Sequence, residues 1–504
     1  MWRDTREARQ RRYEGCLKLC RTLFEPAQAL RQSETSQPEE RRPEDTDAEE
    51  RLREKGAAVK DMHPGCLIDI NVCDYVLSPA LHGYVLWVLR EALASGKQRL
   101  YFLARDGYLM YRTAVILCRE LELDIECRYL CCSRYSIRLP VYHLDHQGAL
   151  EYICRGGIDV TMRKILNRAG FTENEKKEMF AEINEDLRRR GHKTYGPDDP
   201  VAYAELGEIR QSLGQSCRFY QLLDRHSKDA MPALEGYLLQ EGLLEDIPMA
   251  LADSGWVGSM QKVLGQVLDY ISEKNGCRNR KTLEGYYWGL YELPDDADPG
   301  KYHCYYFSPE NHLREKVYFS NCLFECVFSA PHGMTLGYSH EGGFYRPVFG
   351  GISERNRRFI RETEERMKAY TLKLAKVLKD RSAGRLNCEN DRMAVRKLLR
   401  AFMGAPTPEE AERYGQMSFT DDVLEKRGKK LAEPMTEKEL SDNHMFRKAM
   451  AMIGARRGSI KESAWYEGSA VSSGSHVGRH LRRYAGYKYL LYLRKRRVWR
   501  KNHG

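Results

Sequence analysis

The residues LYFLARDGYLMYRTAVILCRE, positions 100–120, decide the fold of this chain. The first five, residues 100–104, form a short and fully apolar run, which is typical of a buried strand. Residues 108–120 have apolar side chains at helical spacing and predict a helix directly after a short polar turn. A strand, a turn and a helix in this order form the unit of a parallel sheet, because parallel neighbours need a crossover connection.

Two further segments repeat this unit along the chain. Residues 127–132 (CRYLCC) predict a second strand, and residues 247–252 (IPMALA) predict a third, followed by a helix over 260–270. Residues 84–94 predict a buried helix ahead of the first strand. The sequence therefore predicts an α/β fold with an open, mostly parallel, Rossmann-like sheet, a helical insertion and a C-terminal helical region.

The regions around this core differ in composition. We expect a helix within residues 1–30 and then a disordered linker, because residues 31–56 carry mixed charge and no aromatic residue. Residues 283–345 are rich in Tyr, Phe and Gly, and we expect further strands there. The expected organisation is a helix and linker (1–60), an α/β core (61–345) with a helical insertion at about 159–245, a helical domain (346–470) and a basic tail (471–504).

The positive charge of the chain is concentrated at its end. The 504 residues carry a formal net charge of +10, from 82 Lys and Arg against 72 Asp and Glu. Ten basic residues and no acidic ones lie in residues 479–504, so the remainder is electrically balanced. A balanced body gives no general reason to bind nucleic acid, and we expect no specific nucleic-acid partner.

The basic tail interleaves Arg and Lys with Tyr, Leu and Trp. This mixture favours an anionic membrane surface over counterion release on DNA or RNA, because the aromatic and leucine side chains can enter the headgroup zone. A solvated tail without a specific partner is the alternative.

Several observations concern the compartment. The sequence shows no apolar run of the ~18 residues that a membrane span needs, and its N-terminus lacks the apolar core of a signal peptide. Its fifteen cysteines include no CxxC pair, which favours reduced thiols over a disulfide framework or an ordinary zinc site. We expect a cytoplasmic protein, held peripherally at the inner face of the membrane where the tail docks.

Polar side chains directly follow the first two predicted strands, where ligands collect in open parallel sheets. Arg105, Asp106 and Gly107 follow the first strand. The guanidinium of Arg105 suits a phosphate, and the carboxylate of Asp106 suits acid/base or Mg²⁺ chemistry. Gly107 allows a ligand to approach the backbone closely. Ser133 and Arg134 follow the second strand and add a hydroxyl and a second guanidinium. In the alternative, structural interpretation, Asp106 caps the next helix and Arg105 pairs with it.

The third predicted strand runs into DSGWVGS, residues 253–259. An acid, two glycines and a hydroxyl before a helix form an arrangement in which backbone N–H groups and the helix dipole hold an anion. We expect Asp253 to act as an acid or base, and Gly255, Gly258 and Ser259 to contact phosphate. Ordinary turn chemistry is the alternative explanation of the two glycines.

The carboxyl ends of parallel strands meet at one edge of a sheet. We therefore expect Arg105, Asp106, Arg134 and Asp253 to converge on one site for a phosphorylated ligand. Glu325, within the apolar run NCLFECVFSAP, is either a buried acid with a raised pKa or an ordinary helix-face carboxylate. The scattered histidines predict no metal site, Mg²⁺ is the single cofactor we consider, and standard P-loop, dinucleotide, zincin and esterase motifs are absent from the sequence.

Five segments, in this order, together resemble one protein family: LSPALHGYVLWVL, YFLARDGYLMYRTA, YLCCSRYSIRLP, ADSGWVGSMQ and NCLFECVFSAPHGMTLGY. Over residues 70–345 the chain is similar to the C-terminal half of predicted bacterial hydrolases of the haloacid dehalogenase (HAD) superfamily, which are often encoded among surface-polysaccharide genes. The RDG and DxGWxGS segments are the distinctive pair. The DxDxT-like nucleophile motif of that superfamily is absent before residue 70, so the resemblance implies polysaccharide biosynthesis without implying phosphatase chemistry.

A looser likeness concerns phosphoribosyltransferases of the common α/β type. Residues 250–259 are similar in layout to the acid-rich strand and Gly/Thr loop that surround the ribose phosphate in those enzymes. The ARDG turn at 104–107 stands where that fold has an arginine and glycine turn for pyrophosphate. This likeness implies phosphoribosyl transfer as an alternative activity.

Together these observations predict an enzyme that binds a phosphorylated sugar or a nucleotide sugar in surface-polysaccharide biosynthesis. Asp106 or Asp253 would perform acid/base or Mg²⁺ chemistry, and Arg105 and Arg134 would hold the phosphate. One alternative is a phosphoribosyltransferase-like enzyme. The other is a non-catalytic scaffold that binds a ligand and docks at the membrane through its tail.

Overall fold

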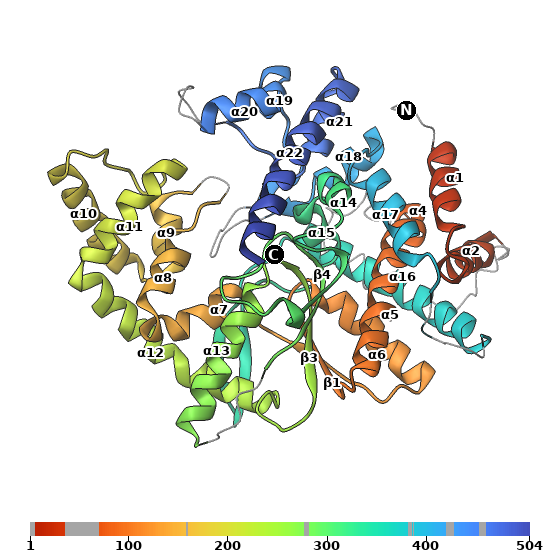
Figure 1. Ribbon diagram of the computed structural model, residues 1–504, viewed down its shortest axis with the longest axis horizontal. Helices are drawn as coiled ribbons and strands as arrows, with labels where there is room; N and C mark the ends of the chain where they lie inside the picture. The colour runs from red at the N-terminus through yellow and green to blue at the C-terminus, as the bar shows by residue number, and fades with distance from the viewer. Residues whose placement is uncertain are drawn as a thin grey trace, which may run out of the picture.

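The structure, a computed structural model, has a central parallel sheet with helices on both faces (Figure 1). It describes residues 6–35, 70–157, 160–276, 282–381, 386, 388–419, 428–452 and 460–503. The sheet has five strands in the order β2-β1-β3-β4-β5, and every neighbouring pair is parallel. The strands are β1 (Arg99–Leu103), β2 (Glu126–Leu130), β3 (Met249–Trp256), β4 (Gly285–Leu290) and β5 (Tyr302–Phe307).

The predicted α/β fold is thus confirmed, and the three predicted strands correspond to β1, β2 and β3. One boundary differs in a way that matters for the site. β3 continues to Trp256, because Asp253, Gly255 and Trp256 pair with Tyr287, Gly289 and Leu290 of β4. The stretch expected to be a turn from Asp253 onward is therefore mostly strand.

Side-chain alternation along the strands builds two hydrophobic layers. Ala250 and Ala252 of β3 belong to the core under α5 (Ser78–Ala94), α6 (Gly107–Leu121) and α16 (Glu354–Lys379). Met249 and Leu251 belong to the core on the opposite face, under α12 (Cys217–Gln240) and α13 (Ser259–Lys274). Both faces are covered, as parallel sheets require.

A continuous helical run crosses the first of these layers. It comprises α4 (Ile70–Val72), η2 (Cys73–Leu77) and α5. Residues 70–94 are long and apolar enough to cross a membrane, which the search for apolar runs in the sequence missed, but the whole apolar window is buried inside the protein. His82 within it hydrogen-bonds to the Ser78 carbonyl at 2.6 Å and to the Thr371 hydroxyl at 2.8 Å. Polar groups satisfied by the protein itself fit a core helix.

A helical insertion follows β2 and has a core of its own (Figure 1, left). Its elements are α7 (Arg134–Arg138), η3 (Leu139–Leu144), α8 (His146–Ile153), α9 (Met162–Arg168), α10 (Glu173–Arg189), η4 (Tyr203–Glu205), α11 (Leu206–Gln215) and α12. The expected start near residue 159 is too late, because Tyr142, Ala149 and Leu150 already pack into this core. The insertion therefore begins directly after β2.

After β3 the chain adds the last strands and two small antiparallel sheets. The elements are α13, β4, η5 (Pro299–Lys301), β5, α14 (Leu313–Tyr318), α15 (Asn321–Val327), β6 (Thr335–Glu341), β7 (Phe344–Phe349), β8 (Ser418–Phe419) and β9 (Lys429–Lys430). Strands β6 and β7 form a hairpin, and β8 pairs with β9. The further strands expected within residues 283–345 are present.

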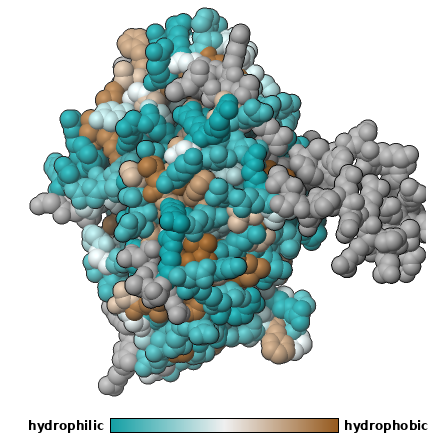
Figure 2. Space-filling model, turned by 90° about the vertical axis from the view of Figure 1, so that its right-hand side faces the viewer, coloured by the Kyte–Doolittle hydropathy of each residue, from teal (hydrophilic) through white to brown (hydrophobic). Residues whose placement is uncertain are grey.

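The C-terminal helical region does not stand apart from the sheet. It contains α16, α17 (Asp391–Phe402), α18 (Pro408–Gly415), α19 (Glu437–Asp442), α20 (Met445–Met452) and α21 (Tyr466–Ser473). Phe359, Leu374 and Leu398 share the core that covers the sheet, and a small separate cluster surrounds Leu440 and Tyr466. The side of the molecule where α16 lies is mostly hydrophilic with scattered apolar side chains (Figure 2).

The N-terminal residues form two helices, α1 (Arg6–Leu17) and α2 (Arg21–Thr35). Arg9 on α1 is buried and donates to the carbonyls of Ala401 (2.6 Å) and Ala405 (2.7 Å) and to the Glu410 carboxylate (3.0 Å). Tyr13 donates to the same carboxylate at 2.7 Å. These contacts fix α1 to the C-terminal helices. The expected linker falls largely on residues 36–69, outside the described residues.

The basic tail is a helix packed on the body of the protein. This helix, α22 (Val477–His503), contacts α14 and α21. Lys488 is buried, with its ammonium 2.9 Å from the Phe319 carbonyl oxygen. The ring of Tyr492 stacks on Tyr291, with centroids 5.2 Å apart. One side of the tail is therefore fixed by core contacts and is not free for another partner.

Candidate functional site

The strand order places a topological switch point between β1 and β3. From β1 the chain proceeds to β2 on one side, and from β3 it proceeds to β4 on the other. Ligands of open parallel sheets bind outside the carboxyl ends of the strands at such a point. Arg105 and Asp106 come shortly after β1, and Asp253 lies in the second half of β3, so these predicted residues stand at this edge of the sheet.

A hydrogen bond joins the ends of the two strands. The Ser254 hydroxyl donates to Asp106 Oδ2 at 2.5 Å. Alternation along β3 points Ser254 to the face of Ala252, toward α6, and Asp253 to the opposite face. Asp106 stands at the start of α6, where the Ala104–Arg105 peptide bond before it is cis, but its side chain makes no capping hydrogen bond. The capping interpretation of Asp106 is therefore wrong.

Glu325 reaches the same edge of the sheet from α15. Its Oε1 accepts a hydrogen bond of 2.6 Å from the indole N–H of Trp256. Trp256 has a positive φ of 67° and packs its ring against Phe319 and Phe324. The carboxyl is thus held between an apolar aromatic group and the polar ends of the strands.

The three carboxyls retain protons to an unusually high pH. Loss of hydration on partial burial raises the pKa of Asp106 to about 6, with Asp253 adding to the rise and Ser254, Arg105 and Arg134 opposing it. The same loss of hydration raises the pKa of Asp253 to about 6, opposed by the N–H groups of Ser254 and Gly255 and by Arg134.

For Glu325, burial and then the charge of Asp106 raise the pKa to about 7, while Arg134, Trp256 and Arg105 lower it. Each of the three residues is partly buried. These mutual effects place the five charged groups within electrostatic range of one another, and their convergence on one ligand site stays a prediction. Carboxyls with pKa values near neutrality are suited to proton transfer at physiological pH.

The two arginines are electrostatically near the carboxyls without being paired to them. In the part of the chain that the structure describes, the guanidinium groups of Arg105 and Arg134 form no hydrogen bond and no ion pair. Arg105 is partly buried and Arg134 is exposed, whereas the buried Arg99 is paired to both Glu126 and Glu245. Unpaired guanidinium groups at a switch point leave their donors free for a bound anion.

Ser133 has a structural role that was not predicted from the sequence. Its hydroxyl donates to the Thr335 carbonyl at 2.6 Å and accepts from the Ser136 N–H at 3.0 Å, capping α7. The single O–H donor of this side chain is thereby used. The predicted phosphate contact at the end of β2 thus depends on Arg134.

The predicted glycines also have structural reasons. A Cβ on Gly107 would lie 3.0 Å from the Phe102 backbone, where α6 starts against β1. Gly255 has a φ of 102°, and a Cβ there would lie 2.8 Å from the Gly289 carbonyl oxygen of β4. Gly258 has a φ of 60° at the start of α13, whose first residue is Ser259. These glycines shape the strand end, and their contact with phosphate stays a prediction.

The charges around the carboxyls bear on the expected Mg²⁺. Within the described ranges, no group of three or more His, Cys, Asp or Glu side chains is arranged to hold a metal ion. Arg105 and Arg134 lower the pKa of the same carboxyls, so positive charge already occupies their surroundings. Mg²⁺ at these carboxyls therefore stays a prediction, and we derive no step through it.

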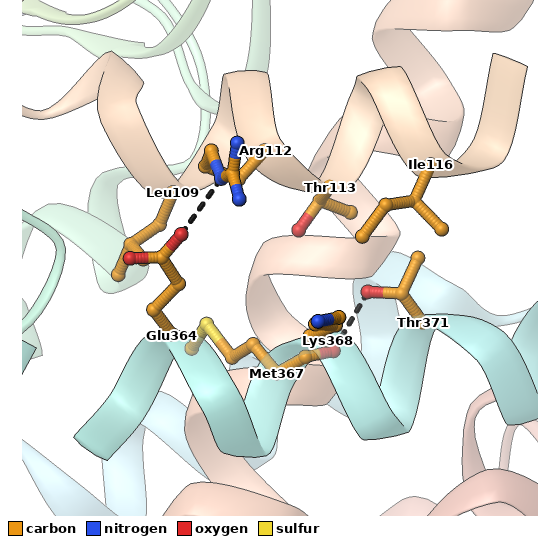
Figure 3. A pocket seen from close by; sticks show the side chains of 8 residues that line it. All are labelled: Leu109, Arg112, Thr113, Ile116, Glu364, Met367, Lys368 and Thr371. Carbon is orange, nitrogen blue, oxygen red and sulfur yellow. Dashed lines mark hydrogen bonds and ion pairs between the residues drawn. The ribbon is translucent and has the colours of Figure 1, made fainter. Parts of the chain in front are cut away.

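A small pocket lies outside the site, between α6 and α16 (Figure 3). Arg112 and Glu364 form an ion pair of 2.7 Å at its edge, and the opposite end is closed by Ile116 and Thr371. The pocket is therefore a gap in the packing of two helices.

Two residues of the site had no role in the sequence prediction, namely Ser254 and Trp256. The available signal was the period of two along a strand, which places Ser254 and Trp256 together on the face opposite Asp253. Because the strand was expected to end at residue 252, the alternation of side chains over residues 253–256 was not predicted. No family model matches this chain, and no curated protein matches it.

Proposed function

We propose that the protein binds a phosphorylated sugar or nucleotide sugar at the carboxyl edge of β1 and β3 and acts on it by acid/base chemistry. Surface-polysaccharide biosynthesis is the proposed setting, from the likeness of the RDG and DSGW segments. One observation carries the proposal: two unpaired guanidinium groups, of Arg105 and Arg134, stand beside three carboxyls with pKa values near neutrality.

In this proposal the arginines bind the ligand and the carboxyls transfer protons. Arg105 and Arg134 bind the phosphate oxygens and neutralise charge that develops on them. Glu325, with the highest pKa of the three carboxyls, donates its proton to the leaving oxygen. Asp106 or Asp253, with the lower pKa values, accepts the proton of the attacking hydroxyl. The indole of Trp256 orients Glu325 through its hydrogen bond.

Replacing Arg105 with alanine is expected to weaken the binding of inorganic phosphate and of a hexose 1-phosphate by about tenfold, the loss typical of a hydrogen bond to a charged group. Isothermal titration calorimetry measures both affinities. The control is Arg112→Ala, which removes an arginine of α6 that is paired to Glu364. Equal affinities in the wild type and Arg105→Ala would remove the phosphate role.

A non-catalytic scaffold with the same ligand differs in one result. An enzyme loses turnover in Asp253→Asn while binding persists, whereas a scaffold shows no turnover of phosphosugars in any variant. The first pattern supports the enzyme, and the second supports the scaffold.

We also propose that α22 docks the protein on an anionic membrane. Apart from Lys495 and Arg500, which pair with acids of the body, the helix exposes six basic and three apolar side chains: Arg479, Arg482, Arg483, Arg494, Arg497, Lys501, Tyr489, Leu490 and Val498. The opposite side is fixed by Lys488 and Tyr492. A basic face with aromatic and leucine side chains is the type of surface that enters an anionic headgroup layer.

The same helix lies beside the candidate site. Lys495 pairs with Glu292 after β4 at 3.3 Å, and Arg500 pairs with Glu310 after β5 at 2.9 Å. Docking through α22 would therefore bring the carboxyl edge of the sheet near the membrane, where lipid-linked sugars are found in polysaccharide assembly.

The double variant Arg482→Gln/Arg483→Gln is expected to bind vesicles of phosphatidylcholine with phosphatidylglycerol about thirtyfold more weakly than the wild type, since each basic residue near such a surface contributes on the order of 1 kcal/mol. Sedimentation with vesicles measures the effect. Arg188→Gln/Arg189→Gln, an exposed arginine pair on α10, is the matched control. Binding that persists in the first variant, or on pure phosphatidylcholine, would contradict the proposal.

A further inference from the structure

Two more arginines stand next to Arg134, on the side of the helical insertion. Arg138 lies four residues after Arg134 on α7, one helical turn away and on the same side of the helix. Arg155 follows α8, where the insertion returns toward the sheet. Arg134 lies close enough to affect the charged state of both, just as it affects Asp106 and Glu325.

These two guanidinium groups are also without ionic partners. Among the residues that the structure describes, neither Arg138 nor Arg155 forms an ion pair or a side-chain hydrogen bond, and the Nε of Arg138 is buried without any partner. Glu292 acts on Arg155 and Asp145 acts on Arg138, but neither acid forms an ion pair with these arginines, and Glu292 is itself paired to Lys495. Among the described residues, no ion pair therefore neutralises the positive charge of this row.

The surroundings hold the side chain of Arg138 and the backbone of Arg155. Arg138 lies over the ring of Tyr152, 4.8 Å from its centroid. The backbone that carries Arg155 is held by Arg168, which is buried and donates to the carbonyls of Ile153 (3.2 Å) and Arg155 (2.5 Å). The side chains of Arg134 and Arg155 are exposed and can be reached from solvent. The held backbone at Arg155 and the ring under Arg138 limit the ordering that anion binding requires.

Repulsion among these arginines lowers the pKa values of Arg138 and Arg155. Desolvation and then the nearby Arg134 lower the pKa of Arg155. Desolvation and Arg134 also lower the pKa of Arg138, although Tyr152, Tyr142 and Asp145 oppose this. Like charges placed together at a cost to the protein are relieved when an anion binds between them.

We infer that Arg138 and Arg155, together with Arg134, form a second phosphate subsite, so that the ligand is a diphosphate such as a nucleoside diphosphate sugar. This inference rests on the proposed function, in which Arg105 and Arg134 hold the first phosphate. The row Arg105, Arg134, Arg138, Arg155 runs from the switch point to the insertion and matches a ligand with two adjacent anionic groups. A monophosphate would leave half of the row unused.

The experiment compares inorganic pyrophosphate with inorganic phosphate, by calorimetry on the full chain at constant ionic strength. The wild type is expected to prefer pyrophosphate, and Arg155→Gln is expected to reduce that preference by about tenfold while its affinity for phosphate is retained. Arg138→Gln is expected to act in the same direction. The control is Arg163→Gln, an arginine of the insertion that is paired to Asp198. Circular dichroism confirms that each variant is folded.

The outcomes separate this inference from the proposed function. If Arg105→Ala weakens both probes but Arg155→Gln and Arg138→Gln leave their ratio at the wild-type value, the second subsite is refuted and the first stands. If Arg105→Ala changes neither affinity, the proposed function fails as well. A loss of preference that the Arg163→Gln control also shows would indicate general charge attraction and would overturn the subsite.

Discussion

Glu325→Gln is expected to raise the free energy of unfolding by about 2 kcal/mol near pH 8 and to leave it almost unchanged near pH 4. In the folded protein, burial and the neighbouring Asp106 raise the pKa of Glu325 from its ordinary value of 4.5 to about 7. Glutamine keeps an acceptor for the indole N–H of Trp256 but carries no charge. The site residue is thus predicted to cost the protein stability at neutral pH.

The sign of this effect follows from proton binding. Between about pH 4.5 and pH 7 the folded protein keeps the Glu325 proton that the unfolded chain has already released. The free energy of unfolding of the wild type therefore falls as pH rises through this window, and the full penalty is present above it. Below the window both states are protonated, so the variant gains nothing. Partial exposure of the side chain keeps the expected value below the full shift.

Urea unfolding at the two pH values measures the difference. Glu341→Gln, at an exposed carboxylate of the β6–β7 hairpin, is the control and should show no such dependence on pH. A stabilisation of equal size at both pH values would point to packing instead of charge. A destabilised Glu325→Gln at pH 8 would contradict the prediction.

Such a cost is common where function needs a strained or charged site. Asp253→Asn tests for the same loss of stability on the opposite face of β3, since burial raises the pKa of Asp253 as well. By contrast, the buried Glu410 is surrounded by the donors Arg9 and Tyr13, and its removal would leave an unpaired cation. The two carboxylates differ in whether the protein supplies them with partners.

The core of the fold could be predicted because short apolar runs alternate with helical periodicity around residues 99–130 and 249–274. The start of the insertion could not, because the apolar spacing of residues 139–153 is helical whether the helices cover the sheet or form a core of their own. The separate N-terminal helices and their attachment through Arg9 to Glu410 depend on contacts about 400 residues apart in sequence, which no local pattern contains.

For the site, the strand ends identified Arg105, Asp106, Arg134 and Asp253, because parallel strands bring their carboxyl ends to one edge. Ser254 and Trp256 were missed because β3 is longer than its apolar run. Glu325 was singled out as an acid in apolar surroundings, but its partner depended on how α15 packs. The arginines of the second subsite become neighbours through the packing of the insertion, which is tertiary information.

The charge of the site predicts a strong pH dependence of anion binding. Sulfate is a suitable probe, because its own charge stays the same across the range used. As pH rises from about 5 to about 8, Asp106, Asp253 and Glu325 lose their protons and up to three negative charges appear beside the anion. Burial and Arg105 lower the pKa of the nearby His332, so this ring adds little positive charge at the lower end.

Each new charge at a distance of about 6 Å costs a bound dianion on the order of 1 kcal/mol at the dielectric constant of a partly exposed site. The affinity for sulfate is therefore expected to fall about a hundredfold over this range. Calorimetry at constant ionic strength measures it, and Asp106→Asn/Glu325→Gln should flatten the profile while keeping the affinity of the acidic form. Because Arg105 and Arg134 keep their charge throughout, an affinity independent of pH would mean that the anion does not bind beside these carboxyls. A steep fall in the wild type that persists in the double variant would assign the titration to other groups, and the arginines and carboxyls would then belong to separate sites.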